Sequence, residues 1–154
     1  MTTYPSELHE QFEQAIVAHP ELSYRWEGDM LVFPSTSPTG FGIQIIAADD
    51  PGSIDAVQVY TDTGLHQFFD GSPHEAVEDA LGLVRDLLSP DMRIRECCAN
   101  GKPYRWILER RAADGWHRES IMGLFFWNWF GRRSERVYQN TQLPGRLHAL
   151  PNSA

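Results

Sequence analysis

Hydrophobic residues recur along this chain with two different periods, and each period predicts a different kind of element. Residues Ser6–His19 place apolar side chains three or four positions apart, which is the spacing of one helix face, and Pro20 ends the pattern. Residues Ser72–Ser89 repeat the helical spacing. They begin with Ser72-Pro73-His74-Glu75, a capping box with proline at the first helical position, which predicts where the second helix starts.

Most of the other hydrophobic residues alternate with polar ones, which is typical of β-strands. Tight-turn sequences separate these segments, among them Gly28-Asp29, Asn100-Gly101 and Ala113-Asp114-Gly115. Because strands joined by such turns pair with their neighbours, we expect antiparallel pairing. The expected strands cover residues 24–33, 41–48, 54–61, 65–69, 92–98, 104–111, 116–120 and 136–140.

Together these elements predict an α+β fold in the order α-β-β-β(-β)-α-β-β-β. Each amphipathic helix needs an apolar surface to cover, so we expect one antiparallel sheet of about six to eight strands with both helices on one face. A chain of 154 residues is expected to form one domain, here over residues 1–142. Pro144, Gly145 and small polar residues predict a flexible C-terminal tail over residues 143–154.

The densest hydrophobic run, residues 121–130, is expected to form the functional surface. It is too short to cross a membrane, which takes about 20 residues, so it is either buried or covered by a partner. As a strand it places Phe125, Trp127 and Trp129 on one face, and as a helix it is apolar all round; both remain open. An exposed aromatic face of this kind marks an interface. The predicted partner-binding residues are Phe125, Trp127, Trp129, Arg132 and Arg133.

Charge divides the chain into two unequal halves. The net charge is −8, but residues 1–90 hold 15 acidic and two basic residues, whereas residues 91–154 hold six acidic and 11 basic residues. The halves either neutralise each other within the fold or leave an acidic surface for a basic partner. Arginines and aromatics interleave from residue 104 to residue 136, as in some nucleic-acid-binding sheets. The negative net charge opposes binding to a polyanion, so nucleic acid is the disfavoured partner.

The N-terminus and the cysteines indicate the compartment. Residues 1–13 are polar and acidic, unlike a signal peptide, so we expect a cytoplasmic protein with no membrane partner. The only cysteines, Cys97 and Cys98, are adjacent. This placement disfavours a disulfide-built fold or a zinc knuckle and favours buried, apolar roles for both thiols.

Candidate chemistry is sparse. His117 and Glu119 alternate on one predicted strand face, which makes them the candidates for a general acid–base pair. The four-residue spacing of His66, Asp70 and His74 resembles a metal site, but the three residues fall on different predicted elements. We therefore expect neither a metal nor a cofactor.

The element order resembles that of bacterial secretion chaperones, small acidic proteins in which one helix precedes three strands and another follows them. The resemblance extends to about Arg111, where that fold ends in a helix and this chain continues with aromatic, strand-like sequence. We expect a non-enzymatic, bacterial-type interaction domain that binds a protein partner, as an immunity protein or a chaperone does, or binds a second copy of itself. The alternative is a small enzyme or ligand-binding domain that uses His117, Glu119 and the arginines of the second half.

Overall fold

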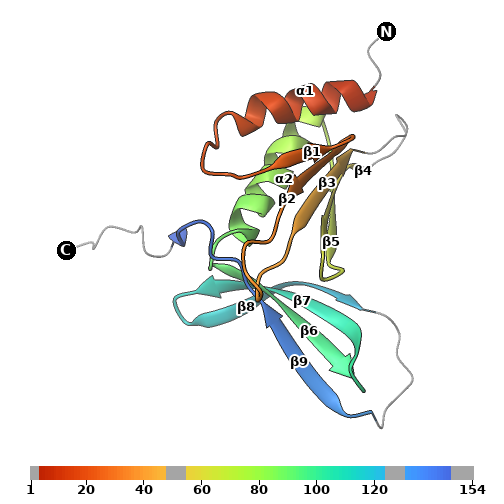
Figure 1. Ribbon diagram of the computed structural model, residues 1–154, viewed down its shortest axis with the longest axis vertical. Coiled ribbons are helices and arrows are strands. Elements are labelled where there is room, and N and C mark those ends of the chain that lie inside the picture. Colours follow the sequence, from red (N-terminus) through yellow and green to blue (C-terminus); the bar gives the residue numbers. More distant parts are fainter. Residues whose placement is uncertain (1–3, 48–54, 124–130, 147–154) are drawn as a thin grey trace, which may run out of the picture. The chain divides into compact units, whose positions relative to one another are not determined.

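The residues described by the computed structural model, 4–47, 55–123 and 131–146, form an α+β fold with antiparallel sheets, which confirms the predicted class (Figure 1). The chain divides into two compact units, which we describe separately. The first contains the described residues within 1–35, 42–62 and 66–85, and the second contains those within 36–41, 63–65 and 86–154. The elements are α1 (Tyr4–Ile16), β1 (Arg25–Glu27), β2 (Met30–Phe33), β3 (Ile43–Ala47), β4 (Asp55–Thr61), β5 (His66–Asp70), α2 (Pro73–Leu87), β6 (Met92–Ala99), β7 (Lys102–Ala112), β8 (Gly115–Gly123) and β9 (Arg133–Tyr138).

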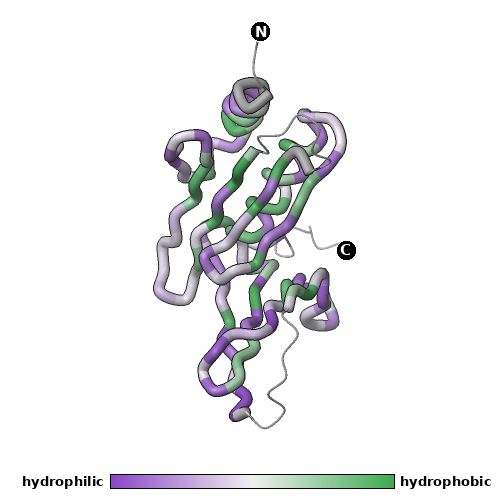
Figure 2. Tube along the Cα trace, turned by 90° about the vertical axis from the view of Figure 1, so that its right-hand side faces the viewer, coloured by the Kyte–Doolittle hydropathy of each residue, from purple (hydrophilic) through white to green (hydrophobic). Residues whose placement is uncertain are grey.

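A five-stranded sheet of order β1-β2-β3-β4-β5 forms the centre of the first unit. Gly28, with a φ of +63°, and Asp29 make the predicted tight turn between β1 and β2. Strand alternation places Leu31, Ile45 and Val59 in one buried row across the sheet, while the opposite face is more polar. The hydropathy colours in Figure 2 alternate along these strands accordingly.

Both helices lie on the same side of this sheet, as predicted (Figure 1). Phe12 and Ile16 of α1 and Val77 and Leu81 of α2 are buried, so each helix directs an apolar stripe inward. Helix α1 ends at Ile16 rather than at the predicted His19. The chain leaves the α-helix in a tighter turn, in which the His19 amide donates to the Ile16 carbonyl at 2.9 Å. Neither described helix is long and apolar enough to cross a membrane.

The capping box at the start of α2 forms as predicted. The Glu75 amide donates to Ser72 Oγ at 3.3 Å, and the Ser72 amide and hydroxyl donate to Glu75 Oε2 at 3.2 and 2.8 Å. These hydrogen bonds from Ser72 lower the pKa of the Glu75 carboxyl.

A four-stranded antiparallel sheet of order β8-β7-β6-β9 forms the second unit. Asn100 and Gly101, with φ values of 51° and 77°, make the predicted hairpin turn between β6 and β7. Two β-bulges interrupt the pairing, because Tyr104 in β7 and Glu119 in β8 have no opposite residue. Strand β9 begins at Arg133, three residues before the predicted strand start.

The strands therefore form two sheets, whereas the sequence predicted one. Hairpins connect β1 to β5 and also connect β6 to β8, so within each group sequence neighbours pair in space. Helix α2 separates the groups in sequence and breaks the series of hairpins. The last strand, β9, then adds to the free edge of β6.

One face of the four-stranded sheet is buried, and its residues Met92, Ile94 and Leu108 are at most 2% exposed. Asn140, which is 1% exposed, ties two segments of this unit together. Its side-chain oxygen accepts the Phe41 amide at 3.1 Å, and its side-chain nitrogen donates to the Phe41 carbonyl at 3.0 Å. A buried amide with several partners orders the surrounding backbone.

The first residues of the predicted flexible tail are docked. Leu143 is only 8% exposed, and its amide donates to the Leu88 carbonyl at 3.1 Å. Gly145 is buried beside Asp91, whose carboxylate accepts the Arg146 amide. Residues 147–154 lie outside the described part of the chain.

Candidate functional site

The second face of the four-stranded sheet carries a concentration of arginines. Paired residues of antiparallel strands share a face, so the register places Glu109 beside Arg93 and Arg118, and Arg105 beside Cys97 and Glu135. We call this surface the arginine face and define it by its cations, which are Arg93, Arg95, Arg105, Arg111, Arg118 and Arg133.

A buried carboxylate holds the centre of the arginine face. Glu109, whose side chain is 7% exposed, accepts Arg93 Nε at 2.6 Å and Arg95 Nη2 at 2.8 Å. Arg95 also contacts the more exposed Glu135 at 3.2 Å through Nη1. Burial opposes the charge of Arg95, but Glu109 and Glu135 outweigh it and raise the pKa of the guanidinium. Arg93 and Arg95 are therefore committed to internal ion pairs.

Two aromatic rings support the arginines near the ends of the strands. The Arg93 guanidinium lies 4.1 Å from the centroid of the Trp116 ring. The ring of Tyr104, the bulge residue of β7, has its centroid 5.6 Å from the guanidinium carbon of Arg105 and 4.9 Å from that of Arg133. Such cation–π contacts orient the guanidinium groups without neutralising them.

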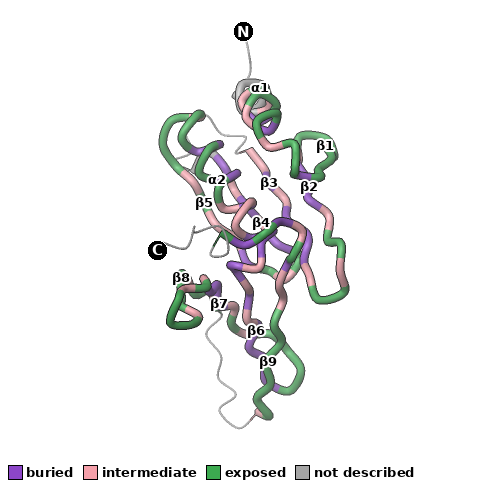
Figure 3. The backbone as a smooth tube through the Cα atoms, turned by 90° about the vertical axis from the view of Figure 1, so that its left-hand side faces the viewer, coloured by how far each residue is buried: buried purple, intermediate pink, exposed green. Residues whose placement is uncertain are grey.

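Three aliphatic side chains and Arg95 cross the middle of the arginine face. The register aligns Ile121 of β8, Ile107 of β7, Arg95 of β6 and Val137 of β9 in one row. Ile107 is buried, but the two outer members remain open, with Ile121 47% exposed and Val137 46% exposed. Strand β6 is mostly buried, whereas β9 is mostly exposed (Figure 3). We call these four residues the central row.

The arginine face retains positive charge. Over residues 4–47, 55–123 and 131–146, no salt bridge joins Arg105, Arg111 or Arg118 to a carboxylate. Within the same ranges, the ion pairs between the acidic first half of the chain and the basic second half all use one residue, Asp86. The described contacts thus leave these three arginines available to an external anion.

The predicted partner-binding residues divide into two groups. Phe125, Trp127 and Trp129 lie outside the described residues, so their role stays a prediction. Arg132 and Arg133 are exposed at the start of β9, where the Arg132 amide donates to Asn100 Oδ1 at 3.0 Å. Arg133 belongs to the arginine face.

The predicted acid–base candidates have different partners. His117 Nε2 lies 2.6 Å from Asp114 Oδ1, and this contact lowers the pKa of Asp114. Glu119 instead accepts Arg110 Nε at 2.9 Å. The side chain of His117 is 55% exposed, so the geometry encloses no reacting group between His117 and Glu119.

The adjacent cysteines are free and buried. Cys97 Sγ lies toward Glu135 on the arginine face, whereas Cys98 Sγ lies toward Glu96 on the other face, because neighbouring residues of a strand point to opposite sides. Burial raises the pKa of both thiols, and the nearby carboxylates add to this effect. Both thiols therefore stay protonated and unreactive near neutral pH.

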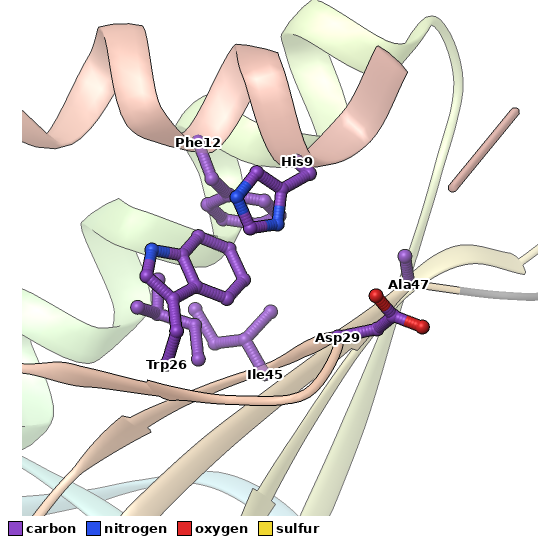
Figure 4. A pocket seen from close by; sticks show the side chains of 7 residues that line it. His9, Phe12, Trp26, Asp29, Ile45 and Ala47 are labelled. Carbon is purple, nitrogen blue, oxygen red and sulfur yellow. The ribbon is translucent and has the colours of Figure 1, made fainter. Parts of the chain in front are cut away.

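The first unit has a small pocket between α1 and the sheet (Figure 4). The His9 ring stacks on Trp26 at 3.8 Å, and Trp26 Nε1 donates to Glu13 Oε1 at 2.6 Å. The pocket has a volume of about 10 Å³, whereas sites for small molecules take about 300–1,000 Å³. Its lining residues are His9, Phe12, Trp26, Asp29, Leu31, Ile45 and Ala47.

No protein-family model, curated protein or solved structure matches this chain. The choice of site therefore rests on the geometry of the described residues. The arginine face combines open cations, aromatic rings and exposed aliphatic side chains on one surface. The interleaved arginines were visible in the sequence, but the cluster around Glu109 was not predicted from it. The signal for this cluster was that Arg93 and Arg95 stand two positions apart in one strand, as Glu109 and Arg111 do in the next. Residues at this spacing share one face of a strand, and a hairpin links the two strands.

Proposed function

We propose that this chain is a non-enzymatic protein-interaction domain that binds a protein partner through the arginine face. The observation that carries the proposal is the composition of that face. Protein interfaces are enriched in Arg, Tyr and Trp and depleted of Lys, and energetic hot spots are drawn from the same residues. The residues that supply these types around the central row are Arg105, Arg118, Tyr104 and Trp116.

The interaction role includes the finer expectations from the sequence. We propose a cytoplasmic, bacterial-type protein that acts as an immunity protein or chaperone does, by occupying the surface of another protein. Arg132 and the aromatic residues Phe125, Trp127 and Trp129 extend the proposed contact in sequence. The competing proposal of a small enzyme or ligand-binding domain has less support, because His117 is open to solvent and the described pocket is small.

The test is affinity capture from lysate of the source cells with matched variants. Arg118→Glu and Val137→Ser change the charge and the apolar contact of the arginine face at exposed positions of edge strands. Arg25→Glu, in the first unit, is the control, because it makes the same charge change at a side chain that is 58% exposed. Circular dichroism establishes that each variant is folded.

We expect a stoichiometric protein to copurify with the wild type and the Arg25→Glu control but to be lost with the Arg118→Glu and Val137→Ser variants. Hydrogen exchange of the purified complex should then slow in β8 and β9. Capture that is equal for all four proteins would refute the assignment of the interface to the arginine face. The absence of any stoichiometric partner would refute the interaction function itself.

A further inference from the structure

We infer that the arginine face recognises an acidic amphipathic helix of the partner protein, with the apolar stripe of that helix on the central row and its carboxylates on Arg105, Arg111 and Arg118. This inference rests on the proposed function and specifies the chemistry of the partner. Three features lead to it: the direction of the central row, the position of the open cations on both sides of it, and the carboxylates within the face.

The central row has the length and direction of a helix-binding track. It crosses all four strands from Ile121 to Val137, and neighbouring strands lie about 4.8 Å apart, so the row spans about 14 Å. A helix rises about 1.5 Å per residue, so this span corresponds to between two and three helical turns. Its two open ends would pack against apolar side chains of the partner at helical spacing.

Open cations lie on both sides of the central row. Along β7, Arg105 is two residues from Ile107 on one side and Arg111 is four residues away on the other. Arg118 of β8 lies opposite Glu109, and Glu109 is two residues from Ile107. Arg118 is therefore on the same side of the row as Arg111. Positions two residues apart in a strand are about 6.7 Å apart. Since a helix with its side chains is about 10 Å wide, carboxylates on both of its flanks would reach these guanidinium groups.

The face itself favours a protein over a nucleic acid. Glu109 and Glu135 place negative charge within it, which opposes a phosphate backbone charged along its whole length more than a helix whose carboxylates lie only on its flanks. The Trp116 ring is covered by Arg93 on one side, which reduces its use as a platform for stacked bases. The exposed Ile121 and Val137 gain from apolar contacts, which a helix with a hydrophobic stripe provides.

The experiment uses the full chain and a fluorescein-labelled designed helix of about 18 residues, long enough to form an isolated helix. Its leucines recur at positions i, i+3, i+4 and i+7, and its flanks carry glutamate. A second peptide has glutamine in place of each glutamate, and a labelled oligothymidylate of equal charge represents nucleic acid. Fluorescence anisotropy gives the dissociation constants at low and high salt.

We expect the glutamate peptide to bind about tenfold more tightly than the glutamine peptide at low salt, and this preference to shrink at high salt. Arg118→Glu should remove the preference. Ile121→Ser together with Val137→Ser should weaken both peptides, and Arg25→Glu should change neither. Arg118→Gln serves as a second, less disruptive variant, for which a partial loss of preference is expected.

Equal affinities for the two peptides, no binding of either, or tighter binding of the oligothymidylate would each overturn the inference. The proposed function is tested independently by capture of a natural partner. If that partner is lost with the Val137→Ser variant while the designed peptides show no charge preference, the interaction function stands and the acidic-helix inference falls.

Discussion

The most informative perturbation of the arginine face is Glu109→Gln, because this one carboxylate holds two guanidinium groups. The substitution keeps the size of the side chain but removes its charge, and one of its two oxygens becomes an amide nitrogen that cannot accept a hydrogen bond. Glu109 accepts from Arg93 at 2.6 Å and from Arg95 at 2.8 Å, and its side chain is 7% exposed. The variant therefore places a donor against a donor at a buried position.

The size of the expected destabilisation depends on how exposed Arg93 and Arg95 are. A hydrogen bond to a charged group contributes about 1.5–3 kcal/mol, and removing one partner of a fully buried ion pair costs about 3–5 kcal/mol. Arg93 and Arg95 are 25% and 28% exposed, so water compensates part of the loss and we expect about 2 kcal/mol. For a chain of this size, that is a decrease in melting temperature of about 4–8 °C.

Glu135→Gln is the matched control, since it makes the same chemical change on the same face. Glu135 is 54% exposed and contacts Arg95 at 3.2 Å, so its loss should cost about 0–1 kcal/mol. Urea denaturation at neutral pH measures both free energies of unfolding. If Glu109→Gln costs under about 0.5 kcal/mol, or no more than Glu135→Gln, the view that Glu109 organises the face is wrong.

Three further predictions concern the ends of α2 and the C-terminal segment. Ser72→Ala should lower the melting temperature by about 3 °C at neutral pH. Because Ser72 lowers the pKa of the Glu75 carboxyl below 4.5, the part of this effect that comes from the carboxylate is present above pH 4.5 and is lost as the pH falls through the folded pKa, so the difference between the two melting temperatures should shrink in acid. Gly145→Ala should destabilise the chain by about 1–3 kcal/mol in urea unfolding, since its Cβ would lie 2.7 Å from Asp91 Oδ1; an unchanged midpoint would contradict this docking. Leu143→Ala should cost about 2 kcal/mol and speed proteolysis of the C-terminal segment, and a wild-type cleavage rate would show that the segment is not held by that side chain.

The fold class was predictable because it depends on local patterns. The capping box at Ser72 and the turn at Asn100-Gly101 each act within a few residues, and the structure forms both as expected. The division into two sheets was harder to predict, because it depends on whether the strands before and after α2 pair with one another, and the position of β9 depends on its long-range pairing with β6. A strand that pairs with a distant partner carries no local signal of where that partner lies.

The arginine face was only partly predictable, because it depends on the register in which β6 pairs with β7. Continued without interruption from the Asn100-Gly101 turn, the hairpin would pair Arg93 with Leu108. The bulge at Tyr104 shifts the register by one residue, so that Arg93 lies opposite Glu109 instead. A shift of one residue moves every side chain of a strand to the other face, and no residue type at position 104 indicates a bulge unambiguously. The alternation was visible in the sequence, but the partner of each residue was not.

The pairing of β7 with β6 constrains how the gene for this protein can change over generations. Deletion of the Tyr104 codon would remove the bulge but would leave Arg105 opposite Cys97 and Glu109 opposite Arg93. Deletion of the Trp106 codon would instead shift the rest of the strand by one residue, so that Glu109 and Arg111 would turn toward the apolar interior and Leu108 toward the arginine face. We therefore expect natural variation in β7 beyond the bulge to consist of amino-acid replacements, with insertions and deletions confined to Tyr104 and to the turns at either end of the strand.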